Sequence, residues 1–147
     1  MNSVVLDASV VLRWVLDDAD EHPGASRMAE GLMHGRVRVM SPDALLPEIA
    51  EVLIRAIRAG RLTSDTAQRL LIELAKLSLD EASPRGLLGD SLGIALEHGM
   101  TVQSAHYVAL ARRTGAAFVS ADGTQLQAAV QMGLRAIALD EVPPLVG

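Results

Sequence analysis

Three acidic residues could together bind a metal ion, because of where they fall in the sequence pattern. Asp7 directly follows the apolar run 4–6, and Asp122 comes shortly after the apolar run 116–119. Glu48 lies among apolar residues in a segment with helical periodicity. The carboxyl ends of the strands form the edge at which open α/β sheets bind ligands. If both apolar runs are strands of one parallel sheet, the acids converge there and make a site for a hard cation.

Each acid also has a structural explanation. Asp7 is suitably placed to cap the helix that follows it, and Ser9 offers a second local acceptor. Asp122 is followed three residues later by Gln125, which is the spacing of a capping box. Glu48 lies on the border of an apolar helix face without a helical ion-pair partner, so its charge needs compensation. Because the three acids together exceed what capping requires, the pattern favours a metal site.

The chemistry expected of such a site is metal-assisted attack on a phosphate ester. Mg²⁺ and Mn²⁺ prefer carboxylate oxygens and keep several waters. Either ion could orient and acidify a water and neutralise charge on a leaving oxygen. The chain has no cysteine, which excludes thiol nucleophiles and zinc–thiolate sites, and none of its four histidines has ligand-like spacing to another. An aspartyl-phosphate enzyme with Asp7 as nucleophile is disfavoured, because Ser9 stands where a second aspartate is needed.

Composition limits the partners. With 147 residues we expect one domain, 1–147. The net charge of −5 disfavours tight non-specific binding to nucleic acid, and three aromatic residues are too few for a base-stacking surface. Neither excludes a nucleic-acid substrate, since a metal-binding acid cluster itself adds negative charge. No apolar run approaches the ~20 residues that span a bilayer, and no signal peptide is evident, so we expect a cytoplasmic protein without membrane contact.

Short apolar runs alternate with helical patterns along the whole chain, which predicts βαβ units and an α/β fold with a mostly parallel sheet of four or five strands. The expected strands are 3–6, 37–40, 77–79, 117–120 and 135–139. A turn is expected at 20–23. Helices are expected from residue 8, from an N-cap within 62–65, and at 24–33, 43–59, 84–97, 104–113 and 123–132.

Four motifs in order make the chain resemble the PIN-domain ribonucleases, specifically the VapC toxins of type II toxin–antitoxin (VapBC) systems. They are residues 5–9 (VLDAS), 47–53 (PEIAEVL), 105–111 (AHYVALA) and 118–122 (FVSAD), and the resemblance covers nearly the whole length. It implies a three-layer α/β/α PIN-like fold and an endoribonuclease dependent on Mg²⁺ or Mn²⁺. It also implies that Asp7, Glu48 and Asp122 are the catalytic and metal-site acids, with Ser9 and Ser120 as polar neighbours.

One position departs from the family pattern. Where the family usually has an aspartate before a tyrosine-containing helix, this chain has Ser104, followed by Ala105, His106 and Tyr107. A serine hydroxyl is a neutral, weak ligand, so the change should weaken cation binding. It is compatible with a natural variant, a naturally inactive member, or a version disarmed by engineering. A non-catalytic PIN-like module that binds a partner protein or RNA is therefore the alternative function.

The resemblance also implies partners: a cognate VapB-like antitoxin whose tail docks near the active site, an RNA substrate, and a second copy in a homodimer. Arginine suits bidentate phosphate contacts. Arg13, Arg55, Arg58 and Arg85 are candidates to contact RNA phosphates, although a solvated helix face is the simpler explanation for any one of them.

Overall fold

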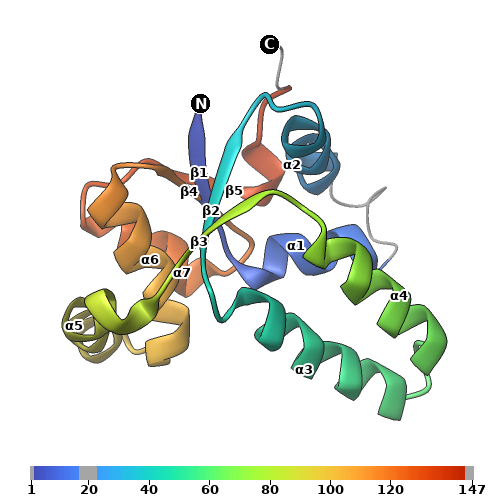
Figure 1. Cartoon of the computed structure of the whole chain (residues 1–147). Coiled ribbons are helices and arrows are strands. Elements are labelled where there is room, and N and C mark those ends of the chain that lie inside the picture. Colours follow the sequence, from blue (N-terminus) through green and yellow to red (C-terminus); the bar gives the residue numbers. More distant parts are fainter. Residues whose placement is uncertain (1, 17–22, 145–147) are drawn as a thin grey trace.

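The computed structural model describes residues 2–16 and 23–144, and its centre is one five-stranded sheet (Figure 1). The strand order is β3-β2-β1-β4-β5, and all neighbouring strands are parallel. The expected α/β class with a sheet of four or five strands is therefore confirmed. The strands are β1 (Ser3–Leu6), β2 (Arg38–Pro42), β3 (Leu79–Ala82), β4 (Ala117–Ser120) and β5 (Ala136–Ala138).

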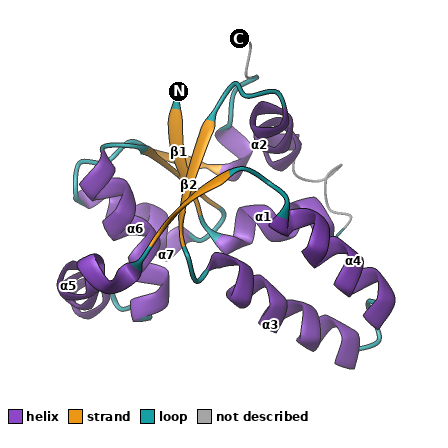
Figure 2. Ribbon diagram, in the orientation of Figure 1, coloured by secondary structure: helices purple, strands orange, loops and turns teal. Residues whose placement is uncertain are grey.

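Helices connect the strands and cover both faces of the sheet (Figure 2). Those in the described residues are α1 (Ala8–Val15), α2 (Pro23–Met33), α3 (Leu45–Arg58), α4 (Ser64–Ala75), α5 (Leu88–His98), α6 (Val102–Thr114) and α7 (Gly123–Gln131), with 3-10 turns η1 (Pro84–Leu87) and η2 (Leu139–Glu141). The expected turn at 20–23 lies outside the described residues, except for Pro23, which begins α2.

The pleat of the central strand divides the core into two layers. Val5 packs into a large cluster that includes residues of α3, α5 and α6, whereas Val4 and Leu6 pack into a smaller cluster with residues of α2 and η2. Successive side chains of a strand point to opposite faces, so this alternation places one helical layer on each side. Because β1 and β4 are almost fully buried, their sequences are continuous apolar runs.

Local signals explain most element ends. Gly60, Gly99 and Gly115 follow helices with positive φ values of 73°, 69° and 71°, as their sequence positions predict. Thr101 caps α6, its Oγ1 accepting a hydrogen bond from the Ser104 amide at 3.0 Å, so the helix begins at Val102 rather than at the expected 104.

Two strand predictions were displaced. The edge strand expected at 77–79 lies at Leu79–Ala82, where it contains two exposed acids. β2 continues through Ser41 and Pro42, two residues beyond the expected end at residue 40. Pro42 is tolerated because pairing with β1 stops at Met40, so only β3 borders the strand at the proline.

Candidate functional site

Asp7 and Asp122 lie at the same edge of the sheet. Asp7 directly follows β1, Asp122 follows β4, and these two strands are paired neighbours. Asp7 occupies the N-cap position of α1, yet its carboxylate makes no capping hydrogen bond of regular geometry. Instead its Oδ1 accepts a hydrogen bond from Ser9 Oγ at 2.6 Å. A regular helix cap therefore does not occupy the carboxylate of Asp7.

Burial changes the acidity of Asp7. Its side chain is only 6% exposed, and this burial raises its pKa from the ordinary 3.8 to about 6. Hydrogen bonds from Ser9 oppose the increase in pKa, and the negative charge of Asp122 adds to it. The repulsion shows that the two carboxylates are electrostatic neighbours at this edge.

Asp122 combines capping with an exposed position. Its Oδ1 accepts a hydrogen bond from the Gln125 amide at 3.0 Å and so caps α7. Its own amide donates to Ser120 Oγ at 2.9 Å. The cap occupies one carboxylate oxygen, and within the described residues Oδ2 has no hydrogen-bond or ion-pair partner, which leaves it available to a ligand.

Glu48 is held by a residue that the sequence did not single out as functional. The hydroxyl of Tyr107, a side chain that is 1% exposed, donates a hydrogen bond to Glu48 Oε2 at 2.6 Å. Burial raises the pKa of Tyr107 well above its usual value, and the hydrogen bond and charge of Glu48 and the charge of Asp7 raise it further. Tyr107 thus contacts Glu48 directly and lies within electrostatic range of Asp7. The sequence could have pointed to Tyr107 on one physical ground, because a buried tyrosine hydroxyl needs a hydrogen-bond partner.

Ser104 and Asp122 face the same pocket. The pocket is open, has a volume of about 390 Å³ and is lined by Gly99, Met100, Thr101, Ser104, Asp122 and Thr124. Ser104 Oγ accepts a hydrogen bond from Thr101 Oγ1 at 3.0 Å. An aspartate at position 104 would therefore bring a further carboxylate to the wall that Asp122 already lines.

The two predicted polar neighbours connect the strand ends. Ser9 Oγ, besides donating to Asp7, accepts a hydrogen bond from the Ala121 amide at 3.1 Å. Ser120, which is fully buried, donates from Oγ to Gln125 Oε1 at 2.9 Å. The bonds of Ser9 tie the start of α1 to the residue after β4, and the bond of Ser120 ties β4 to α7.

The candidate RNA-contacting arginines lie on α1, α3 and η1. Arg55 and Arg58 are exposed near the end of α3, about 10 Å and about 15 Å from Glu48 along the helix axis. Arg85 is exposed in η1, and Arg13 is half-buried in the last turn of α1. Their contact with RNA stays a prediction.

The acids suit a hard cation, although they would not fill its coordination shell by themselves. Within residues 2–16 and 23–144, Asp7, Glu48 and Asp122 form no ion pair with a basic side chain. In that same part of the chain no three acidic or histidine side chains lie close enough to hold one ion together. The donors suit Mg²⁺ or Mn²⁺ bound through one or two carboxylates with water completing the shell, a common arrangement for Mg²⁺.

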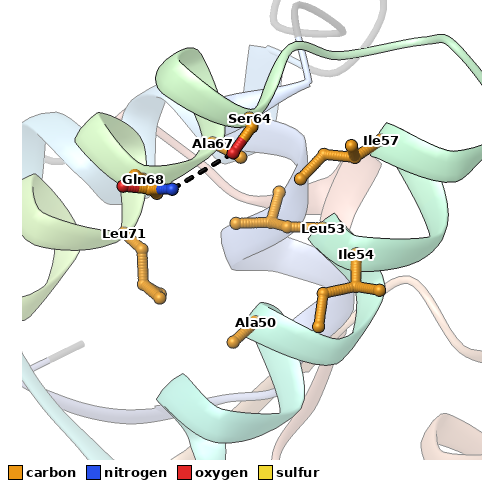
Figure 3. A pocket seen from close by; sticks show the side chains of 8 residues that line it. All are labelled: Ala50, Leu53, Ile54, Ile57, Ser64, Ala67, Gln68 and Leu71. Atoms are coloured by element: carbon orange, nitrogen blue, oxygen red, sulfur yellow. Dashed lines mark hydrogen bonds between the residues drawn. The ribbon is translucent and has the colours of Figure 1, made fainter.

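A second pocket has a different character. It is an apolar groove of about 280 Å³ between α3 and α4, lined by Ala50, Leu53, Ile54, Ile57, Ser64, Ala67, Gln68 and Leu71 (Figure 3). Its two polar residues bond to each other: Gln68 Nε2 donates a hydrogen bond to Ser64 Oγ at 3.1 Å. Because its lining contains no charged residue, the groove is unsuited to phosphate chemistry.

A parallel sheet with helices on both faces defines a three-layer α/β/α fold, the architecture that the resemblance to PIN-domain proteins implies. Comparisons with known proteins agree. The crystal structure of PAE2754 from Pyrobaculum aerophilum matches with a TM-score of 0.66 at 22% identity, covering 95% of this chain and 92% of that one, which shows the shared fold.

A curated relative shows the family. Ribonuclease VapC3 of Pyrobaculum aerophilum is 31% identical over 121 residues, which are 81% of this chain and 88% of that protein. This chain belongs to the VapC family. No family model matches the sequence. None of the described helices is both long and apolar enough to cross a lipid bilayer.

Proposed function

We propose that this chain is an endoribonuclease that depends on Mg²⁺ or Mn²⁺ and acts as the toxin of a VapBC pair. The observation that carries this proposal is the buried Asp7 carboxylate, which lies beside Asp122 at the sheet edge and has no basic partner in the described residues. The resemblance to a ribonuclease, VapC3, supports the choice of substrate.

The chain's own groups have distinct roles in this proposal. Asp7 and Asp122 would hold the cation, with Glu48 contributing directly or through water. A bound Mg²⁺ or Mn²⁺ would supply a more acidic attacking water and neutralise charge on the phosphodiester. Ser9 keeps Oδ1 of Asp7 oriented, and Tyr107 keeps Oε2 of Glu48 oriented. Burial of Asp7 lowers the local dielectric constant, which strengthens its electrostatic interactions.

A second candidate function is a non-catalytic module that binds a protein or RNA. Ser104 favours it, because this position contributes no charge to the pocket that Asp122 lines. The absence of a three-acid group within the described residues favours it too. A site with fewer charges should bind the cation more weakly, so the proposed ribonuclease is an attenuated one.

The proposed toxin would have three macromolecular partners: a VapB-like antitoxin, the RNA it cleaves, and a second copy of itself. It would act in the cytoplasm. Co-purification with a co-expressed antitoxin and light scattering of the isolated chain test the antitoxin and the homodimer separately.

The decisive experiment is cleavage of a mixed RNA substrate with Mg²⁺ or Mn²⁺, comparing the chain as it stands with Ser104→Asp. We expect slow cleavage by the former and at least about 10-fold faster cleavage by the latter, with EDTA and Asp7→Asn abolishing both. If only Ser104→Asp cleaves, this chain is the non-catalytic form of a ribonuclease. If neither cleaves any RNA, the ribonuclease proposal is wrong and the binding module replaces it.

A further inference from the structure

Gln125, in the first turn of α7, is a buried glutamine that uses both ends of its side-chain amide. It is 2% exposed. Its Oε1 accepts a hydrogen bond from Ser120 Oγ at 2.9 Å, and its Nε2 donates to the Ser104 backbone carbonyl at 3.0 Å. A carbonyl oxygen can only accept, so the contact with Ser104 fixes which way the amide faces.

These bonds differ from those of a complete capping box. In that motif the glutamine side chain returns to the amide of the N-cap residue. Here the Asp122 amide donates to Ser120 Oγ, while the Gln125 backbone amide donates to Asp122 Oδ1. The capping box predicted from the Asp122–Gln125 spacing is therefore only half formed. The Gln125 side chain is left to reach another element, α6, 21 residues away in sequence.

Gln125 consequently connects both walls of the pocket described above. Its side chain bonds to the backbone of Ser104, and its amide bonds to the carboxylate of Asp122. Its remaining contact, Ser120 Oγ, in turn accepts a hydrogen bond from the Asp122 amide. The Gln125 side chain thus contacts the residue at position 104 directly and Asp122 through Ser120.

We propose that Gln125 is a positioning residue, which sets the separation of Asp122 from residue 104 and thereby the cation affinity of the edge. Its importance for catalysis rests on the proposed function, but its effect on geometry does not. An apolar residue of similar volume at position 125 would remove the hydrogen bonds that the Gln125 side chain makes with the Ser104 carbonyl and the Ser120 hydroxyl. Groups that orient metal ligands in this way typically change affinity by about 10- to 100-fold.

The test is a set of substitutions in two backgrounds, the chain as it stands and Ser104→Asp, with Mn²⁺ binding measured by calorimetry. Gln125→Leu is compared with Gln127→Leu, a matched change at an exposed glutamine of the same helix. We expect Ser104→Asp to tighten Mn²⁺ binding about 10-fold, since ligand charge tunes affinity. Gln125→Leu should remove that gain, and Gln127→Leu should keep it. Gln125→Met serves if the leucine variant does not fold.

A second readout needs no metal. Amide hydrogen exchange at Asp122 should accelerate about 10-fold or more in Gln125→Leu or Gln125→Met, because Ser120 Oγ loses the acceptor that orients it. Unchanged exchange, or equal Mn²⁺ affinity in the position-125 and position-127 variants, would overturn the positioning role. If exchange accelerates while neither background binds Mn²⁺ nor cleaves RNA, Gln125 still positions Asp122 and the proposed function is what fails.

Discussion

At the scale of single residues, burial of Asp7 makes its ionised carboxylate unfavourable unless a cation compensates the charge. Its carboxylate is almost fully enclosed, yet the described residues supply hydrogen-bond donors and no basic side chain. The folded state therefore holds a proton on Asp7 more tightly than the unfolded chain does. Above the folded pKa of about 6 the ionised group costs stability, and a bound divalent ion would remove that cost.

We predict that Asp7→Asn stabilises the metal-free protein. Stability from Asp7 is fully present below pH 3.8, declines as the pH rises to about 6, and stays lost above it. The amide keeps an acceptor for Ser9 without the charge. Urea unfolding without divalent ions should give equal stability near pH 4 and a gain of up to about 3 kcal/mol for Asp7→Asn at pH 7. A loss of stability at pH 7 would contradict the inferred cost.

A second residue-scale prediction concerns Tyr107→Phe. Removing the hydroxyl that donates to Glu48 Oε2 should destabilise the fold by about 1.5–3 kcal/mol, the range for hydrogen bonds to charged groups. It should also weaken Mn²⁺ binding about 10-fold by releasing Glu48. The matched control is Ser91→Ala, which removes a buried hydroxyl bonded to His106 at 2.7 Å. Calorimetry should show reduced affinity for the tyrosine variant alone; equal affinities would make Tyr107 purely structural.

The acids and their interactions differ in how far sequence could predict them. Asp7 and Asp122 follow apolar runs, so local pattern alone placed each of them after a strand. The hydrogen bond between Tyr107 and Glu48 joins residues 59 apart in sequence, and nothing local to either residue specifies the other. The Gln125 contacts were missed for the same reason, and its capping spacing suggested a different partner.

At the scale of elements, the helix ends that a glycine marks were predictable from the sequence. The strand ends that depend on pairing with a neighbouring strand were not. Glycine with positive φ closes α3, α5 and α6 where the sequence placed it. β3 lies at Leu79–Ala82 because its register is fixed by β2, from Val39 opposite Leu79 to Pro42 opposite Ala82. Its exposed acids hide the strand from an apolar pattern, since an edge strand is only partly buried.

Two threonine caps allow an element-scale prediction. Thr101 begins α6 at the candidate site, and Thr63 begins α4 away from it; each accepts from the amide three residues on, at 3.0 Å and 3.2 Å. Each hydroxyl also contacts that residue's own hydroxyl. Thr101→Ala and Thr63→Ala should both cost about 1 kcal/mol in urea unfolding.

The two threonine substitutions should differ in their effect on Mn²⁺ binding. Thr101→Ala frees the first turn of α6, which carries position 104, so we expect weaker Mn²⁺ binding in the Ser104→Asp background for this variant. Thr63→Ala should leave the affinity unchanged. Equal affinities for the two variants would show that the start of α6 does not shape the site.

At the scale of the whole molecule, layers were easier to predict than strand order. Alternating strands and helices imply a parallel sheet with helices on both faces. The order β3-β2-β1-β4-β5 depends on which strands meet after the chain crosses over, and no short segment encodes this. That order is nevertheless what makes β1 and β4 neighbours and brings Asp7 and Asp122 together.

In the smaller core layer, α2 packs closely against the segment around η2 because residue 24 is a glycine. A Cβ at Gly24 would lie 1.8 Å from the Leu139 carbonyl oxygen and 3.3 Å from Val142 Cβ, so α2 and the segment around η2 could not stay in place. Arg27 holds the same segment, its Nη1 donating to the Val142 carbonyl at 2.6 Å. Substitution at Gly24 must therefore displace backbone rather than a flexible side chain.

We predict that Gly24→Ala destabilises the protein by about 3 kcal/mol or more, because it overpacks a buried interface. Gly93→Ala is the matched control: it also lies within a helix, but its Cβ would meet nothing within 4 Å. Alanine there should stabilise α5 by about 0.5–1 kcal/mol through reduced backbone entropy of the unfolded chain. Urea unfolding of both variants decides the matter. If Gly24→Ala is as stable as Gly93→Ala, then α2 does not pack against the C-terminal segment, and the layer that buries Val4 and Leu6 is closed in some other way.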